Sequence, residues 1–363
     1  MRVLLGLTMV LTASCGGDEP AKEPTAFRSE GSEPGDCTDR ADNDSDGLFD
    51  CNDDGCAGSP DCVEADADSD SDSDSDVDAD TDADTDADAD TDSDSDSENI
   101  CEGDYFIGST GAFERVADCV EINGDLAIED SSTLTNLDPL SGLRSIRGNL
   151  TIVGNENLSN IDGLTSLNSV GGKLKLLYNE NLASLNGLEN LNSVGKELRV
   201  AQTALLNMNG LSGLTTVGGP IAIISNDHLT DLDGLSSLIS VGTTGTSLDT
   251  LPGLTIGDNK ELAHINGLNN LETIQGSLGI NRNPKLLNLA GLQNLNSIGD
   301  EMWITENNAL SSLIGLYSLT SLGGKVVIMD NDFLCQSLVD EYINTLEALG
   351  LSPGPWSRSN ADC

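Results

Sequence analysis

The sequence predicts an all-β solenoid that follows a long acidic amino-terminal region. Two features of one repeated unit lead to this prediction, its residue pattern and its regular interval. A unit reading L-x-I-x-x-N-x-x-L-x-x-L-x-x-L-x-x-L-x-x-I/V-G recurs at intervals of 24, 24, 24, 23, 33, 24, 24 and 24 residues, so the chain holds about nine coils of 24 residues. The lead residues of these units are Leu126, Leu150, Leu174, Leu198, Ile221, Leu254, Leu278, Met302 and Val326. Repeats of this length indicate a solenoid, in which each unit buries its apolar side only against its neighbours.

Residues 1–14 have the features of a secretory signal. A single arginine precedes a short apolar run, and small residues come just before Cys15. The run is too short for a stable transmembrane anchor. Small residues before a cysteine resemble a bacterial lipobox, although Thr12 departs from the pattern. That resemblance implies lipidation of Cys15 and, with Gly16 following it, attachment to the outer membrane. The alternative is an ordinary signal peptide with an incidental cysteine.

Residues 15–35 form a tether to a small acidic module at residues 36–62. Calcium prefers six to eight oxygen ligands, and carboxylates at alternate positions around a turn glycine can supply them. The expected ligands are Asp42, Asp44, Asp46, the carbonyl of Leu48, Asp50 and Asp53. Gly47 supplies the turn, but no apolar helical pattern flanks the loop, so it is not an EF-hand.

This module resembles a thrombospondin type 3 calcium repeat and the short acidic modules of myxobacterial surface proteins. With so few apolar residues it needs covalent links to fold. Its four cysteines allow three disulfide pairings. They are Cys37, Cys51, Cys56 and Cys62. Two alternatives are a merely acidic turn and a zinc or copper site, but the carboxylates favour a hard ion.

Residues 63–100 form a disordered stalk. From Asp66 to Asp96 every second residue is Asp, sixteen in all, with Ser, Ala or Thr and one Val between them. Such a segment cannot bury a core, and charge repulsion extends it to a reach of about 100 Å. We expect a spacer between membrane and solenoid, with weak cation binding as a compatible second role.

Composition excludes one class of partner. The formal net charge is −46, and residues 16–100 hold 32 acidic and three basic side chains. Nucleic-acid binding requires Lys and Arg to replace phosphate counterions, so no nucleic-acid partner is expected. The nine cysteines lie outside the repeats, and without Cys15 they form an even set that suits an oxidising compartment.

Within each coil, apolar residues follow at every third position. One such run is Leu158, Ile161, Leu164, Leu167 and Val170, and it closes at Gly171-Gly172. This spacing fits short extended segments joined by bends, whereas a long amphipathic helix alternates three and four. The fifth residue after the lead is Asn in seven coils, with Ser131 and Thr203 at two others. Stacked amides that bond to turn backbone and to one another explain this column.

The pattern Ile146-x-Gly148-x-Leu150-x-Ile152-x-x-Asn155 departs from the usual leucine-rich repeat. It resembles the receptor L domain over residues 101–363. That resemblance implies a right-handed parallel β-solenoid with three narrow sheets and a cap at each end. Cys101 and Cys119 enclose Phe106 and Phe113 in a region similar to the amino-terminal cap of the family.

At the other end, Ser337 to Leu349 has helical spacing through Leu338, Tyr342, Leu346 and Leu349. We predict the disulfides Cys101–Cys119 and Cys335–Cys363. The one long interval, near Gly242 to Asp249, indicates a surface loop, which in repeat proteins often lies on the binding face.

No catalytic constellation is visible, and we expect no enzyme. The outward position next to the lead holds no carboxylate, and His228 and His264 fall in different columns. The candidate ligand face consists of five side chains on neighbouring coils or on the same sheet. They are Lys175, Leu177, Tyr178, Arg199 and Trp303.

The sequence therefore favours an exported surface lipoprotein with bound calcium, anchored in the outer membrane and facing either the cell surface or the periplasm. Its solenoid is expected to bind a protein or glycan in recognition or adhesion. The alternative is a structural envelope protein that acts as a rigid spacer or self-associates.

Overall fold

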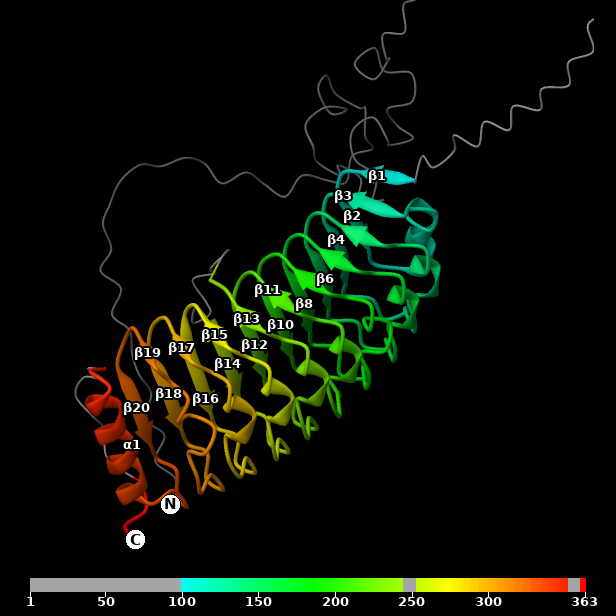
Figure 1. Cartoon of the computed structure of the whole chain (residues 1–363). Helices are drawn as coiled ribbons and strands as arrows, with labels where there is room; N and C mark the ends of the chain where they lie inside the picture. Colours follow the sequence, from blue (N-terminus) through cyan, green and yellow to red (C-terminus); the bar gives the residue numbers. More distant parts are fainter. Residues whose placement is uncertain (1–98, 244–252, 352–359) are drawn as a thin grey trace, which may run out of the picture. The chain divides into compact units, whose positions relative to one another are not determined.

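The computed structural model describes residues 99–243, 253–351 and 360–363 (Figure 1). The signal peptide, Cys15, the tether, the calcium module with its four cysteines and the acidic stalk lie outside the described residues, apart from the stalk's last two positions. Most of the expected loop near residues 242–249 also lies outside them. Among the described residues we find no helical segment with the length and hydropathy of a membrane span.

The solenoid is built from two parallel sheets of ten strands, and each coil contributes one strand to each sheet. Sheet A contains β1 (Ile100–Glu102), β3 (Glu121–Asn123), β5 (Ser145–Ile146), β7 (Ser169–Val170), β9 (Ser193–Val194), β11 (Thr216–Val217), β13 (Ser240–Val241), β15 (Thr273–Ile274), β17 (Ser297–Ile298) and β19 (Ser321–Leu322). Sheet B contains β2 (Tyr105–Ile107), β4 (Leu126–Glu129), β6 (Leu150–Val153), β8 (Leu174–Leu177), β10 (Leu198–Ala201), β12 (Ile221–Ile224), β14 (Gly253–Gly257), β16 (Ser277–Asn281), β18 (Met302–Thr305) and β20 (Val326–Met329).

The predicted all-β parallel solenoid is therefore confirmed. Each lead residue begins or lies in a strand of sheet B, and successive leads pair in register, as Leu174 does with Leu198. One more coil precedes the nine of the sequence repeat, because Tyr105 pairs with Leu126 although its segment lacks the repeat motif.

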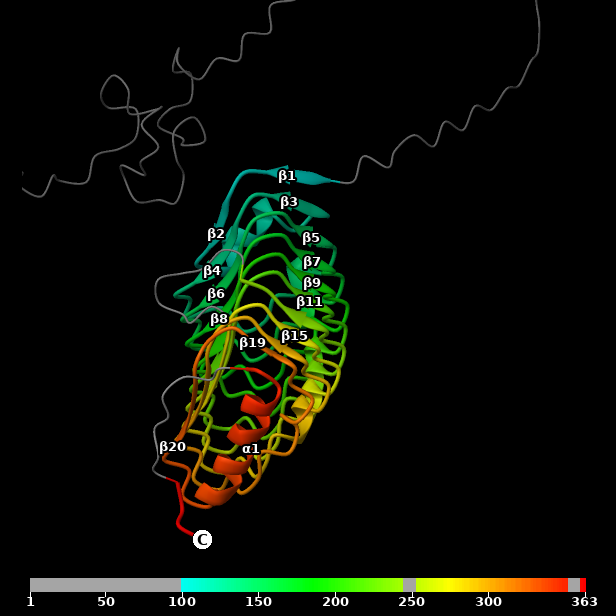
Figure 2. The same cartoon turned by 60° about the vertical axis from the view of Figure 1, so that its left-hand side comes forward.

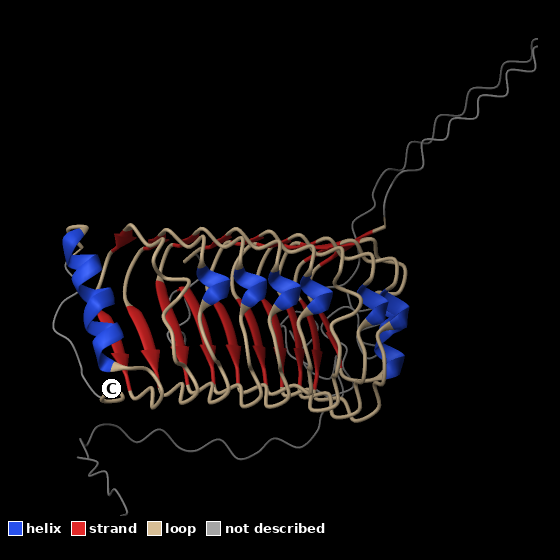
Figure 3. Cartoon of the chain, turned by 60° about the horizontal axis from the view of Figure 1, so that its bottom comes forward, coloured by secondary structure: helices blue, strands red, loops and turns tan. Residues whose placement is uncertain are grey.

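The expectation of three sheets was wrong. Two sides of each coil are strands of sheets A and B, whereas the third side consists mainly of 3-10 turns, which form a row in Figure 3. They are η6 (Asp138–Leu140), η7 (Asp162–Leu164), η8 (Asn209–Leu211), η9 (Asp233–Leu235), η10 (Asn266–Leu268) and η11 (Ala290–Leu292). A 3-10 helix has three residues per turn, so apolar residues spaced by three point to one side. Single backbone hydrogen bonds still join coils here, as from Ala263 N–H to the Thr230 carbonyl at 2.9 Å.

One continuous apolar core fills the coils. In the run that starts at Leu158, the side chains Ile161, Leu164 and Leu167 are fully buried. Burying a residue of this size contributes roughly 1.5–3 kcal/mol, so the stacked coils are held together mainly by these columns.

The asparagine column forms the expected ladder. Asn259 donates its backbone N–H to Asn283 Oδ1 at 3.2 Å, and Asn283 does the same to Asn307 at 3.1 Å. The Nδ2 of Asn283 also donates to the Ile256 carbonyl of the preceding coil at 3.0 Å. The ladder joins buried polar groups of adjacent coils, which explains why amides recur at this position.

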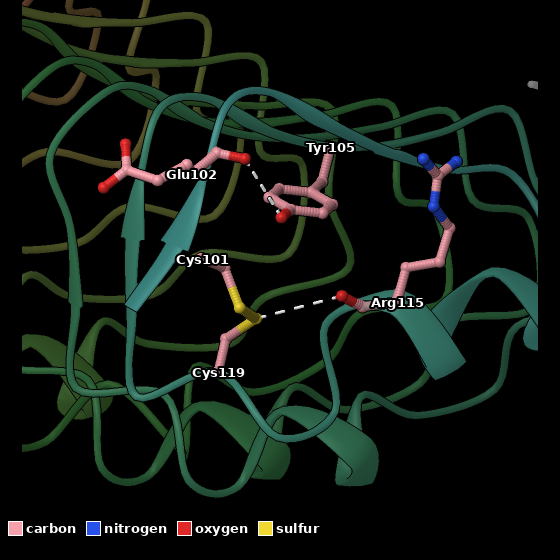
Figure 4. The surroundings of a disulfide bond; sticks show 5 residues. All are labelled: Cys101, Glu102, Tyr105, Arg115 and Cys119. Carbon is pink, nitrogen blue, oxygen red and sulfur yellow. Dashed lines mark hydrogen bonds between the residues drawn. A yellow bond between two sulfur atoms is a disulfide. The ribbon is translucent and has the colours of Figure 1, made fainter. Parts of the chain in front are cut away.

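The amino-terminal end is covered by η5 (Thr110–Arg115), which buries Phe113. The predicted disulfide Cys101–Cys119 is confirmed, and it ties β1 to the segment after η5 (Figure 4). Close to it, the Tyr105 hydroxyl donates to the Glu102 carbonyl at 3.1 Å. The Cys119 sulfur lies 3.9 Å from the carbonyl oxygen of Arg115.

The carboxy-terminal end is covered by α1 (Gln336–Ala348), which lies across the last coil (Figure 2). The predicted helix and the disulfide Cys335–Cys363 are confirmed. The buried side chains of α1 are Val339, Tyr342, Ile343 and Leu346. Leu349, expected on this buried face, is 53% exposed because it follows the end of the helix.

Candidate binding surfaces

The outer face of sheet B brings the first part of the predicted ligand face together. The lead residue and the second residue after it point into the core, so the first and third residues after it point outward. Lys175 on β8 lies directly opposite Arg199 on β10, and Leu177 lies opposite Ala201. The 24-residue interval between Lys175 and Arg199 is one coil, which is why the sequence predicts this contact.

Neither cation has a carboxylate partner among the described residues, and the Arg199 Nε atom is buried without a hydrogen bond. Six other basic side chains of these residues form ion pairs. They are Arg147, Lys173, Lys260, Arg282, Lys285 and Lys325. Residues 101–363 hold 30 acidic and 12 basic side chains, so acidic residues are plentiful, yet Lys175 and Arg199 lie opposite each other on the sheet without an ion pair in the described part of the chain.

A buried carboxylate lies beside this pair. Glu197, two residues before Arg199, has 1% of its surface exposed, and both its oxygens lack a hydrogen bond. Lys173 Nζ lies 3.5 Å from Glu197 Oε2 and accounts for its charge. Glu197 is therefore matched to Lys173, which leaves the charge of Lys175 and Arg199 uncompensated.

Trp303 lies on the same sheet but apart from this pair. Four strand-to-strand steps separate β10 from β18, which is about 19 Å at the usual strand spacing. Its Nε1 donates to Glu301 at 2.9 Å, and Lys325 Nζ lies 4.6 Å from its ring centroid. Local contacts thus hold Trp303, and it does not share a patch with Arg199.

Tyr178 lies at the bend that follows β8, not on the sheet. Its backbone is left-handed, with φ of 56°, and its side chain is 56% exposed. Every coil from Asp130 to Asp330 places this position in the left-handed region. Tyr178 points to a second surface, formed by that column of bends.

Two cavities follow the bends along the solenoid, with volumes of about 970 Å³ and 540 Å³. They share Glu180, and the smaller one is lined by Asp130, Glu156 and Tyr178. In the larger one, Arg282 donates to both oxygens of Asp258 at 2.6 and 2.8 Å. Together the two cavities form a groove, which is lined mainly by the fourth and sixth residues after each lead. These polar positions recur at the coil interval, so the sequence could have indicated the groove if the polar columns had been examined as one surface.

Comparison with known protein families gives a match for part of the solenoid. Residues 250–344 match the receptor L domain. The match covers the last four coils and most of α1, and this domain is a β-helical, ligand-binding type. No curated protein matches the chain significantly.

Outside residues 250–344, the coils from β4 to β12 repeat the geometry of the part that matches the receptor L domain, with the same two sheets and the same ladder. The confirmed disulfides and the receptor L domain match agree with an exported protein. Lys175 and Arg199 lie before the matched region, whereas Trp303 lies within it.

The two histidines do not meet. His228 lines the larger groove, whereas His264 lies with Nδ1 3.6 Å from Asp233 Oδ1 on the side of the 3-10 turns. Within residues 99–243, 253–351 and 360–363, no group of three or more metal-ligating side chains comes together. The expected calcium ligands lie outside these ranges.

Proposed function

We propose that the protein is an exported, non-catalytic recognition or adhesion protein whose solenoid binds a protein or glycan on the outer face of sheet B. One observation carries the proposal, namely the in-register pair Lys175 and Arg199, which lacks acidic partners in the described part of the chain. Like charges directly opposite in a sheet destabilise it, so a ligand is the simplest reason to keep them together.

The scaffold supports this proposal. Coils joined by a buried ladder and one apolar core hold outward side chains at fixed spacing, which suits recognition. The receptor L domain match is to a ligand-binding type of domain. The outward column that contains Lys175 and Arg199 offers neither carboxylate nor imidazole for acid–base chemistry.

We further propose that Cys15 anchors the protein in the outer membrane through lipid. The short apolar run and the small residues before Cys15 support this. Mass spectrometry of the mature amino terminus tests it, and a free thiol on Cys15 would refute it. Shaving intact cells with protease, followed by release of residues 101–363, separates the cell-surface orientation from the periplasmic one.

We also propose that the acidic module binds calcium through Asp42, Asp44, Asp46, Asp50, Asp53 and the Leu48 carbonyl. Alternate carboxylates around Gly47 support it. Titration calorimetry of the full chain should show a tight calcium site above the weak background of the stalk. Asp46→Asn should remove that site alone, and an unchanged isotherm would refute the assignment.

The test of recognition is saturable binding of the soluble full chain, with Cys15 replaced by Ser, to purified cell envelopes. Lys175→Glu should weaken binding at least tenfold, because it reverses one charge of the pair. Lys196→Glu is the matched control, since Lys196 is an exposed lysine at the preceding corner, and it should bind like the parent. Binding unaffected by Lys175→Glu, or self-association without envelope binding, would instead favour the structural envelope role.

A further inference from the structure

We infer that the partner at the sheet B face is an acidic segment of another protein, with an acidic residue two positions from an apolar one. This inference rests on the proposed function and names the partner class for the same face. It concerns two neighbouring strands, β8 and β10, and the four outward side chains Lys175, Leu177, Arg199 and Ala201.

Charge is the first argument. The face presents two adjacent positive charges on a chain of net charge −46, and no carboxylate among the described residues compensates them. Glu197, which directly precedes β10, is buried and already lies beside Lys173. A ligand that brings carboxylates removes the repulsion between Lys175 and Arg199, and Arg can hold a carboxylate through two parallel hydrogen bonds.

Spacing is the second argument. On each strand the apolar residue follows the cation by two positions, as Leu177 follows Lys175 and Ala201 follows Arg199. The repeat along an extended chain is about 6.6–6.8 Å for two residues, so an extended partner with the order acidic, any, apolar has the same period. Such a segment laid along β8 places its carboxylate at Lys175 while its apolar side chain reaches Leu177.

The apolar column is the third argument, and it separates protein from glycan. Val153 on β6 and Ile224 on β12 extend the line of Leu177 and Ala201 on either side. These four positions lie in a row beside the cations, with Val153, Leu177 and Ile224 partly exposed and Ala201 buried at 9% exposure. A uronate polymer offers carboxylates but no aliphatic side chain, so it buries less of that row than a peptide with an apolar residue does.

The experiment measures binding of fluorescent peptides to the full chain by anisotropy. The probe is a peptide of several Asp-Ser-Leu-Ser repeats. Its controls are an Asp-Ser-Ser-Ser peptide of equal charge, a Lys-Ser-Leu-Ser peptide and polygalacturonate. We expect the first probe to bind about tenfold more tightly than the others. Its affinity should fall as salt rises, since exposed charges are screened.

Variants locate the binding. Lys175→Gln with Arg199→Gln should weaken the Asp-Ser-Leu-Ser probe about tenfold, and Leu177→Ser should weaken it while leaving the Asp-Ser-Ser-Ser peptide unchanged. Lys196→Gln is the control for loss of one charge nearby. Thermal melting of each variant establishes that the solenoid is intact.

Three outcomes would overturn the inference. They are equal binding of both acidic peptides, preferential binding of polygalacturonate, and full affinity in the charge variant. If envelopes bind and Lys175→Glu abolishes that binding while no acidic peptide competes, the proposed function stands and the acidic–apolar partner does not.

Discussion

At the residue scale, Asn283 shows how one side chain joins three coils. Its Oδ1 accepts from the backbone N–H and the Nδ2 of Asn259, and its Nδ2 donates to the Ile256 carbonyl of that same preceding coil and to Asn307 Oδ1 of the next coil. The side chain is fully buried, so each of these groups would lack a partner without it. A buried unsatisfied polar group costs about 1–3 kcal/mol, which is why the column keeps amides.

We therefore expect Asn283→Ala to lower the free energy of unfolding by about 2–5 kcal/mol, because it strands several buried groups at once. Urea denaturation followed by circular dichroism measures this. The control is Asn294→Ala, which removes an exposed amide that donates to the Asn269 carbonyl at 2.7 Å and should cost less than about 1 kcal/mol. Equal losses in both variants would show that the ladder is not a source of stability.

At the element scale, the 3-10 side depends on glycines that allow close approach of coils. A Cβ on Gly234 in η9 would lie 1.8 Å from the Met208 carbonyl oxygen of the preceding coil. The same crowding recurs at Gly210, Gly267 and Gly291. The requirement at these positions is space between coils rather than positive φ, because their φ values are not positive.

Gly234→Ala should accordingly destabilise the solenoid by about 3 kcal/mol, since backbone must move to admit the methyl group. Gly142→Ala is the matched substitution, because no atom lies within 4 Å of its Cβ position, and it should change stability by less than about 0.5 kcal/mol. The measurement is the urea midpoint of each variant at constant m-value. A tolerated Gly234→Ala would mean that the coils stack less tightly on this side.

At the scale of the whole molecule, both ends of the solenoid are closed by covalent links. The tail supplies the last rung of the ladder, because Asn360 Oδ1 accepts the Asn331 backbone N–H at 3.2 Å. Asn360 Nδ2 in turn donates to the Ile328 carbonyl at 2.9 Å. Cys363, three residues on, is bonded to Cys335 at the start of α1 and so holds Asn360 in place.

Cys363→Ser should release this rung. Because the disulfide closes a separation of 28 residues, its loss should cost about 2–4 kcal/mol, and solenoids lose structure from their ends. Hydrogen exchange should show faster exchange of the Asn331 amide and unchanged exchange at Cys119, near the opposite end. Continued protection of Asn331 would mean that Asn360 stays docked without the disulfide.

The sequence alone determined the parts of this protein that repeat or lie close in the chain. A fixed interval defines the coil, so the lead positions, the core columns, the asparagine ladder and the pairing of Lys175 with Arg199 could all be predicted. The helix that caps the last coil and both described disulfides also followed from local spacing and position.

Only the tertiary structure decided the features that depend on contacts between coils. An apolar spacing of three is compatible with short strands and with 3-10 turns, and packing selected the turns. Outward side chains do not pack in the core, so the apolar pattern says little about which of them lie close together. The sequence therefore grouped Trp303 and Tyr178 with Arg199. In the structure, strand order separates Trp303 from Arg199, and a backbone bend separates Tyr178 from the sheet. Asn360 carries no repeat signal, because its place in the ladder is set by a disulfide and not by the period.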